Sequence, residues 1–202
     1  MIAIIDYGMS NLRSVRHAFE ALGADARIVD SPAALRNARA LVLPGDGAFG
    51  PAMENLRAYG WLEPLRAAIE RGVPFLGICL GMQLLFDSSK ENGAHRGLGI
   101  LRGTVKKFPS AAGKIPHIGW NQLQIQANSK FLAGLAQNTF VYFVHSYYCD
   151  ARDKNVIAAR AEYGISFTSV VEADNVWGAQ FHPEKSGADG LRMLGNFLRL
   201  AP

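Results

Sequence analysis

A cysteine stands in this sequence where an α/β fold would place a nucleophile. Residues 77–81 have the sequence Gly-Ile-Cys-Leu-Gly, after an apolar run and before a segment with helical spacing. In this pattern the nucleophile occupies a strained turn between strand and helix, and the flanking glycines relieve crowding there. The N-terminus of the following helix favours a thiolate and offers N–H groups to an oxyanion. Cys79 is therefore the candidate nucleophile, although a buried structural cysteine also fits this motif taken alone.

A base and a carboxylate that could orient it stand near the end of the chain. Residues 180–184 have the sequence Gln-Phe-His-Pro-Glu. Residues i and i+2 of an extended chain point to the same side, and Pro183 biases His182 toward extended backbone. His182 can then take the thiol proton while Glu184 holds the imidazole in the required tautomer. A His-x-Glu pair alone is more often a surface pair, but together with Cys79 it predicts a Cys-His-Glu triad.

A glycine-rich segment, residues 44–50, follows a neighbouring predicted strand. Its sequence, Pro-Gly-Asp-Gly-Ala-Phe-Gly, can bring backbone N–H groups close to an oxyanion, or it can form an ordinary tight turn. It lacks the pattern of a phosphate-binding loop, and no glycine pattern of a dinucleotide site follows the first strand. No spacing of His and Cys resembles a zinc site. We therefore expect neither a cofactor nor a metal ion.

Alternating periods in the first half predict the elements that position these residues. Four short apolar runs predict buried strands: residues 2–5, 26–29, 40–43 and 74–78. Segments with helical spacing lie between them, and a further helix is predicted over residues 80–86. Alternation of buried strands and helices predicts a parallel sheet that is covered on both faces.

The second half changes to successive strands without long helices between them. The candidate strands are residues 140–144, 156–161, 167–172 and 176–181. They predict an antiparallel addition to the sheet, followed by a closing helix, while residues 87–97 are predicted to form a loop. The expected fold is a single α/β domain over residues 1–202, with an open, mostly parallel sheet flanked by helices and antiparallel additions in the second half.

Composition limits the classes of function. The 202 residues are 49 % hydrophobic and 19 % charged, which fits one soluble globular domain with a large core. The net charge is +4, but the basic residues are scattered, so we expect no nucleic-acid partner. Two cysteines make no disulfide framework. No signal peptide or membrane-spanning run is recognisable, so a cytoplasmic protein is expected.

Three of these segments together resemble the signature segments of the class I, triad-type glutamine amidotransferases: residues 44–50, 77–83 and 180–184. Four others resemble the branch of that family whose glutaminase subunit supplies ammonia for histidine biosynthesis: residues 6–8, 116–121, 143–147 and 182–186. The resemblance runs in matching order from about Ile4 to the last helix. It implies the flavodoxin-like fold of that family and hydrolysis of L-glutamine.

The resemblance implies roles that the spacing does not show. Cys79 would attack the glutamine carboxamide to give a glutamyl thioester, and the oxyanion would be held by N–H groups of Leu80 and of the segment Gly45, Asp46, Gly47. Five residues match positions that bind the amino and carboxylate groups of glutamine: Gln83, Glu91, His145, Ser146 and Tyr147. Four match positions at or near the interface with a (β/α)8 barrel cyclase subunit in a heterodimer: Asn11, Trp120, Asn121 and Lys185.

Two residues depart from the pattern of the family. Asp46 stands where a small apolar residue, often Val, is expected. A carboxylate turned toward a developing oxyanion would repel it, so we expect the Asp46 side chain to point elsewhere. Ser146 replaces Thr and keeps the hydroxyl group.

Two other functions fit parts of the sequence. The chain could be a glutaminase that feeds a synthase making pyridoxal phosphate, guanylate or anthranilate, although its length argues against the fused members and residues 119–121, Gly-Trp-Asn, favour the histidine branch. A non-catalytic thiol sensor on the same fold would not need His182 and Glu184 where they stand. Of the other candidates, His117 could be structural or interfacial, and Cys149 is expected to be a packed thiol.

Overall fold

The computed structural model describes residues 1–9, 11–126 and 129–201. Strands and helices alternate in its first half: β1 (Ile2–Ile5), α1 (Leu12–Ala21), β2 (Ala26–Val29), the 3-10 helix η1 (Pro32–Asn37), β3 (Ala40–Gly45), α2 (Phe49–Ala58), α3 (Leu62–Glu70), β4 (Phe75–Cys79) and α4 (Leu80–Leu84). The remainder is rich in strands: β5 (Phe86–Ser89), β6 (His95–Arg96), β7 (Leu101–Lys107), the 3-10 helix η2 (Ser110–Ala112), β8 (His117–Gln122), β9 (Gln124–Ile125), β10 (Phe140–His145), β11 (Tyr147–Ala151), β12 (Ile157–Glu162), β13 (Ser166–Ala173) and β14 (Val176–Ala179). The 3-10 helix η3 (Pro183–Lys185) and helix α5 (Gly187–Leu200) close the chain.

One large sheet organises the molecule. Its twelve strands include the path β2-β1-β3-β4-β14-β13-β11-β7-β5-β6, while β12 pairs with β13 and β9 pairs with β12. The strands from β2 to β14 are parallel, whereas β13, β11 and β7 continue the sheet in antiparallel pairs. Strands β8 and β10 form a separate antiparallel pair. The expected α/β fold, a mostly parallel sheet with antiparallel additions in the second half, is confirmed.

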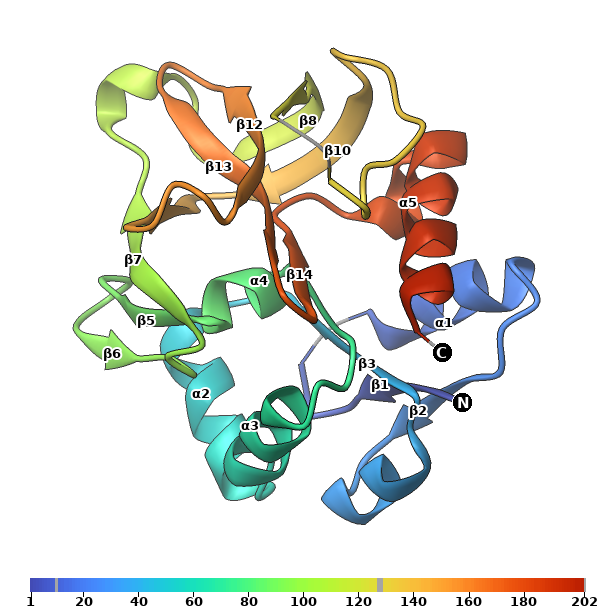
Figure 1. Cartoon of the computed structure of the whole chain (residues 1–202). Coiled ribbons are helices and arrows are strands. Elements are labelled where there is room, and N and C mark those ends of the chain that lie inside the picture. Colours follow the sequence, from blue (N-terminus) through green and yellow to red (C-terminus); the bar gives the residue numbers. More distant parts are fainter. Residues whose placement is uncertain (10, 127–128, 202) are drawn as a thin grey trace.

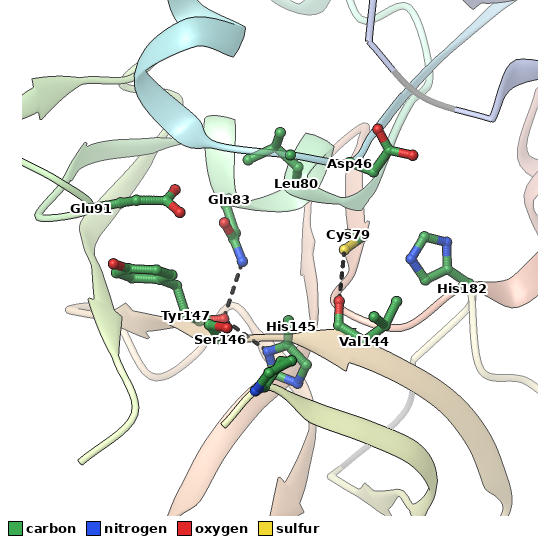
Figure 2. A pocket seen from close by; sticks show the side chains of 12 residues that line it. Asp46, Cys79, Leu80, Gln83, Glu91, Val144, His145, Ser146, Tyr147 and His182 are labelled. Carbon is green, nitrogen blue, oxygen red and sulfur yellow. Dashed lines mark hydrogen bonds between the residues drawn. The ribbon is translucent and has the colours of Figure 1, made fainter. Parts of the chain in front are cut away.

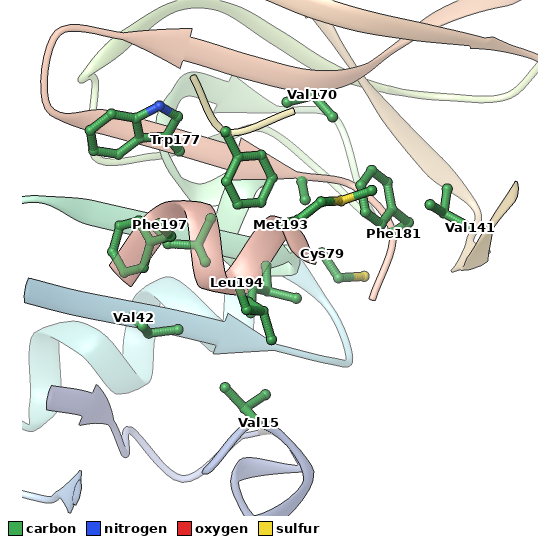
Figure 3. Close-up of a cluster of buried hydrophobic side chains, with 14 of the residues drawn as sticks. Val15, Val42, Cys79, Val141, Val170, Trp177, Phe181, Met193, Leu194 and Phe197 are labelled. Atoms are coloured by element: carbon green, nitrogen blue, oxygen red, sulfur yellow. The ribbon is translucent and has the colours of Figure 1, made fainter. Parts of the chain in front are cut away.

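The central strands are apolar on both faces because both faces are covered. Ile2 and Ile4 belong to the core cluster beneath α1 and α5, whereas Ala3 and Ile5 alternate with them into the cluster beneath α2 and α3. Figure 1 shows these two helix pairs on opposite sides of the parallel strands. Figure 3 shows the first cluster, in which side chains of α1, α5, β3 and β14 meet close to Cys79.

The strands and helices that were predicted from a hydrophobic periodicity are confirmed. The predictions were wrong for short polar segments. The strands predicted over residues 2–5 and 26–29 have the predicted bounds. The helix predicted over residues 80–86 ends at Leu84, and the predicted loop 87–97 contains β5 and β6 instead. These residues are extended because β5 pairs with β7 on one side and with β6 on the other, and such pairing leaves no periodic pattern in a short polar segment.

Two further differences affect the site. The strand expected over residues 176–181 ends at Ala179, so Gln180 and His182 lie in the connection that leaves the sheet. Strand β8 was not predicted, because its middle contains Gly119 and the polar Asn121. In the register of the sheet, Gly45 pairs with Cys79, and Ala179 pairs with Ile78. The carboxyl ends of β3, β4 and β14 therefore meet at one edge, where open α/β sheets bind ligands.

Candidate active site

Cys79 lies at the sharp turn between β4 and α4. Its backbone has φ 55° and ψ −109°, a strained conformation for a residue with a side chain. A Cβ atom on Gly81 would lie 1.8 Å from the carbonyl oxygen of Leu43, and one on Gly77 would lie 2.6 Å from that of Gly81. Both glycines are therefore required for α4 to approach the strands, and the structure has the sharp strand-to-helix turn that the sequence predicted at Cys79.

His182 and Glu184 form a buried pair next to this turn. His182 Nδ1 and Glu184 Oε1 are 2.8 Å apart, and the two side chains are 9 % and 2 % exposed. Glu184 lies in the 3-10 helix η3, and this turn of the backbone brings its carboxylate to the His182 ring. The sequence analysis had assumed extended backbone at this point. His182 Nε2 is buried without a hydrogen-bond partner among the described residues, and the ring lies beside the Cys79 sulfur in Figure 2.

The charge state of His182 is set by competing effects. Burial alone lowers the pKa of the imidazole, but the contacts with Cys79 and Glu184 outweigh it and raise the pKa to about 10. His182 is therefore protonated at neutral pH. An imidazolium beside the sulfur stabilises a thiolate, and its Nε2 proton is available to a leaving group.

The sulfur opens into a pocket with a volume of about 260 Å³. All five residues that were expected to bind glutamine line it: Gln83, Glu91, His145, Ser146 and Tyr147. Asp46, Gly47, Leu80 and His182 complete the wall, together with Pro116 and Val144, which the sequence analysis missed. Tyr147 and Glu91 lie at the end of the pocket away from Cys79 in Figure 2.

Several of these side chains are already engaged by the protein. Gln83 Nε2 donates hydrogen bonds to the carbonyl oxygen of Tyr147 and to Gln180 Oε1, both at 3.1 Å. Glu91 Oε2 accepts a hydrogen bond from the Phe49 N–H at 2.7 Å, which caps α2. Both ring nitrogens of His145 are hydrogen-bonded within the fold, so its imidazole is not free to bind a substrate.

The segment predicted to hold an oxyanion lies across from Cys79. Asp46 is exposed, and its carboxylate points away from the sulfur in Figure 2, which agrees with the expectation for this unusual residue. The Tyr7 hydroxyl donates a hydrogen bond to the carbonyl oxygen of Pro44 at 3.0 Å, which helps to hold the segment in place. Burial, and to a lesser degree the charge of Asp46, raises the pKa of Tyr7, so this donor keeps its proton.

The residues predicted at a partner interface do not share one orientation. Trp120 is 56 % exposed, whereas Asn121 turns inward from the same strand. Asn11 caps α1 by accepting a hydrogen bond from the Ser14 N–H at 3.4 Å, and Lys185 is exposed in η3.

The outer face of the β8–β10 pair is mostly apolar. It consists of Ile118, Trp120, Phe140, Tyr142 and Val144, with the exposed Gln122 beside Phe140 at one end, and we call it the β8–β10 face. Ile118 and Phe140 are 59 % and 53 % exposed, and Trp120 packs edge-to-face on Tyr142. Because Val144 also lines the pocket, this face begins at the site itself.

Gln180, whose buried side chain contacts the Cys79 sulfur, was not singled out by the sequence analysis. It lies inside the segment that contains His182, and its signal was an amide in an otherwise apolar run. In the part of the chain that the structure describes, no cluster of three or more His, Cys, Asp or Glu side chains is arranged to hold a metal ion. No helix within residues 1–9, 11–126 and 129–201 has the length and apolar composition needed to cross a membrane.

The chain matches known proteins over nearly its whole length. The family model described as glutamine amidotransferase class-I matches residues 3–201. Proteins named imidazole glycerol phosphate synthase subunit HisH are 50 % identical in Desulfitobacterium hafniense and 52 % identical in Aquifex aeolicus, covering 98 % of this chain and 93 % and 96 % of theirs. A solved structure described as a glutamine amidotransferase has the same fold, with a TM-score of 0.79, 23 % identity and coverage of 100 % of this chain and 99 % of that chain.

Proposed function

Because the chain belongs to the class-I glutamine amidotransferase family, we propose that it is the glutaminase subunit of imidazole glycerol phosphate synthase, an enzyme of histidine biosynthesis. The observation that carries the proposal is the buried His182–Glu184 pair, whose unpartnered Nε2 faces Cys79 inside the pocket. Half of the residues are identical to those of relatives with that name. The whole chain, residues 1–202, then acts as one glutaminase domain in the cytoplasm.

The geometry supports thioester chemistry. The Cys79 thiolate attacks the carboxamide carbon of glutamine, and the oxyanion that forms is held by the N–H of Leu80 and an N–H of residues 45–47. The proton on His182 Nε2 passes to the nitrogen as the carbon–nitrogen bond breaks, so ammonia leaves and a glutamyl thioester remains. His182 then removes a proton from water, which attacks the thioester and releases glutamate and the thiolate.

The ammonia is used by a partner. In this proposal it passes to a (β/α)8 barrel cyclase subunit, which joins it to a phosphorylated ribulosyl intermediate. The products are imidazole glycerol phosphate and an aminoimidazole carboxamide ribonucleotide. The β8–β10 face supports such a partner, because an exposed apolar patch of several residues that starts at the pocket is typical of an interface.

Supply of ammonia to a different synthase is the alternative. The relatives named HisH and the exposed Trp120 favour the histidine enzyme. Copurification with the barrel cyclase would separate the two, since a glutaminase of another pathway would bind another synthase.

We expect the isolated chain to release glutamate slowly, and the cyclase subunit with its nucleotide ligand to raise the rate by about tenfold or more. Uncoupled hydrolysis would waste ammonia, which is the reason for expecting weak activity alone. The measurement is glutamate formation from glutamine with the chain alone, with the cyclase, and with the liganded cyclase. Fast turnover by the chain alone that the partner does not change would contradict the proposed coupling.

Replacing Glu184 by alanine is expected to lower kcat for glutamate release by about 10²- to 10⁴-fold, less than loss of the nucleophile. The reason is that Glu184 orients and charges His182 but does not contact the substrate. Glu63→Ala is a matched control, because this carboxylate is 82 % exposed and pairs only with Arg66. A loss equal to that of Cys79→Ala would show that Glu184 does more than orient the base.

A further inference from the structure

Gln180 places an amide between two residues of the site. Its side chain is fully buried, and its Nε2 donates to the Cys79 sulfur at 3.8 Å, a distance suited to a hydrogen bond to sulfur. Its Oε1 accepts from Gln83 Nε2 at 3.1 Å. Gln83 Nε2 also donates to the carbonyl oxygen of Tyr147, which can only accept. The atom of Gln180 that faces Gln83 must therefore be the oxygen, so its N–H is directed at the sulfur.

The same carbonyl oxygen connects this pair to two buried histidines. His145 Nδ1 lies 2.8 Å from the oxygen of Tyr147, so this nitrogen carries a proton. Burial lowers the pKa of His145 to about 3, so the ring is neutral and its Nε2 accepts. The donor is His117 Nδ1 at 3.0 Å. His145 and His117 lie directly opposite each other in the pairing of β10 with β8.

The series of hydrogen bonds ends at Asn121 in β8, the strand that also contains the exposed Trp120. Burial lowers the pKa of His117 to about 4, so its Nε2 accepts as well, and Asn121 Nδ2 lies 3.3 Å away. Inverting the Asn121 amide would break two hydrogen bonds. Its Oδ1 accepts from the Gln122 N–H at 2.7 Å, and its Nδ2 also donates to the Glu162 carbonyl oxygen at 2.8 Å. Every amide and tautomer from Asn121 to Gln180 is therefore assigned by its neighbours.

Taking Cys79 as the nucleophile of the proposed function, we propose that Gln180 stabilises its thiolate as a hydrogen-bond donor and that Gln83, bound to the Tyr147 carbonyl oxygen, keeps the Gln180 amide in that orientation. The series His145, His117 and Asn121 holds that carbonyl in place. Inverting the amide would turn Oε1 toward the sulfur, which repels a thiolate. Gln180 acts on the reacting atom, whereas His117 and Asn121 are positioning residues.

The role of Gln180 is distinct from that of the ionisable groups nearby. His182 is the titratable group whose charge acts on the sulfur, whereas Tyr7 and Cys149, which are more remote, keep their protons because burial raises the pKa of each. His182 supplies a charge that also moves as the proton is transferred. Gln180 supplies a donor that does not titrate, so its contribution stays constant over the working pH range.

The test is the rate of Cys79 alkylation by iodoacetamide as a function of pH, in the isolated chain with Cys149→Ala as background. Gln180→Leu is expected to move the midpoint of this profile upward by roughly one to two pH units, the size of a lost hydrogen bond to a charged group. Gln180→Glu is expected to move it in the same direction. An unchanged midpoint in a folded Gln180 variant would overturn the role of Gln180.

Variants of His117 test the series without changing a residue that contacts the Cys79 sulfur. They also test the proposal if the Gln180 variants do not fold. His117→Phe keeps a ring but removes the donor to His145, so the midpoint should rise by about half a unit or more. His117→Asn restores it, since an Asn amide nitrogen occupies the position of Nδ1. Tyr163→Phe is the control: its ring stacks on His117 with centroids 4.0 Å apart, but its hydroxyl contacts only the Lys114 carbonyl.

The outcomes separate this proposal from the proposed function. A His117→Phe protein that is less stable but has the wild-type alkylation profile would show that the series is only structural. Alkylation needs neither glutamine nor a partner. Absence of glutaminase activity in the wild-type complex would therefore count against the proposed function, and an unmoved profile against the role of Gln180 and its series.

Discussion

Replacing Cys79 by alanine is expected to reduce glutamate release by the liganded complex by about 10⁴-fold or more. Without the sulfur no thioester can form, and neither His182 nor the oxyanion donors provide a substitute bond to carbon. Cys79→Ser should lose nearly as much, because a hydroxyl group is a far weaker nucleophile at neutral pH. The measurement is glutamate formation under saturating glutamine with the cyclase subunit and its nucleotide ligand present.

A matched control is available because the chain has a second buried cysteine. Cys149 lies in β11, and burial raises the pKa of its thiol well above the ordinary value. Cys149→Ala should keep glutaminase activity. The Cys79→Ala complex should still make product when ammonium salt replaces glutamine, since the partner remains bound. Glutamate release that survives in Cys79→Ala would remove the thioester mechanism, and loss of the ammonium reaction as well would indicate a disrupted complex.

The arrangement of Cys79, His182 and Glu184 was predictable because its signals are local. The turn at Cys79 needs a strand, two glycines and a helix within a few residues, and each of these leaves a mark in the sequence. The pair His182 and Glu184 is separated by one residue. Even here the reasoning was incomplete, because η3 and not extended backbone brings the carboxylate to the ring.

The hydrogen bonds around these three residues were not predictable in the same way. Gln83 and Gln180 are 97 residues apart in sequence, and Gln83 and Tyr147 are 64 apart. The contact of His145 with His117 depends on the register of β10 against β8, and β8 has little strand propensity of its own. Such contacts are set by tertiary packing. A single sequence shows only the amide or imidazole in an apolar context, without its partner.

Replacing Gly81 by alanine is expected to destabilise the fold by several kcal/mol, a large share of the roughly 5–15 kcal/mol that holds a domain together. The added Cβ would lie 1.8 Å from the Leu43 carbonyl oxygen and 2.8 Å from its carbon, and both atoms are backbone of β3. No side chain can move to relieve this contact, so α4 must retreat from the sheet. That displacement would also move Leu80 and Cys79, so activity should fall with stability.

Gly195→Ala is the control that separates the steric clash at Gly81 from any general loss of stability on replacing a helical glycine. Gly195 lies within α5, where an added Cβ would meet only Arg199 and Leu22 at 3.9 and 4.0 Å, ordinary contact distances. Alanine should stabilise that helix by about 0.5–1 kcal/mol. Chemical denaturation of the two variants beside the wild type compares them directly. A Gly81→Ala protein with wild-type stability would mean that α4 does not press against β3, and then the strained turn that presents Cys79 would need another cause.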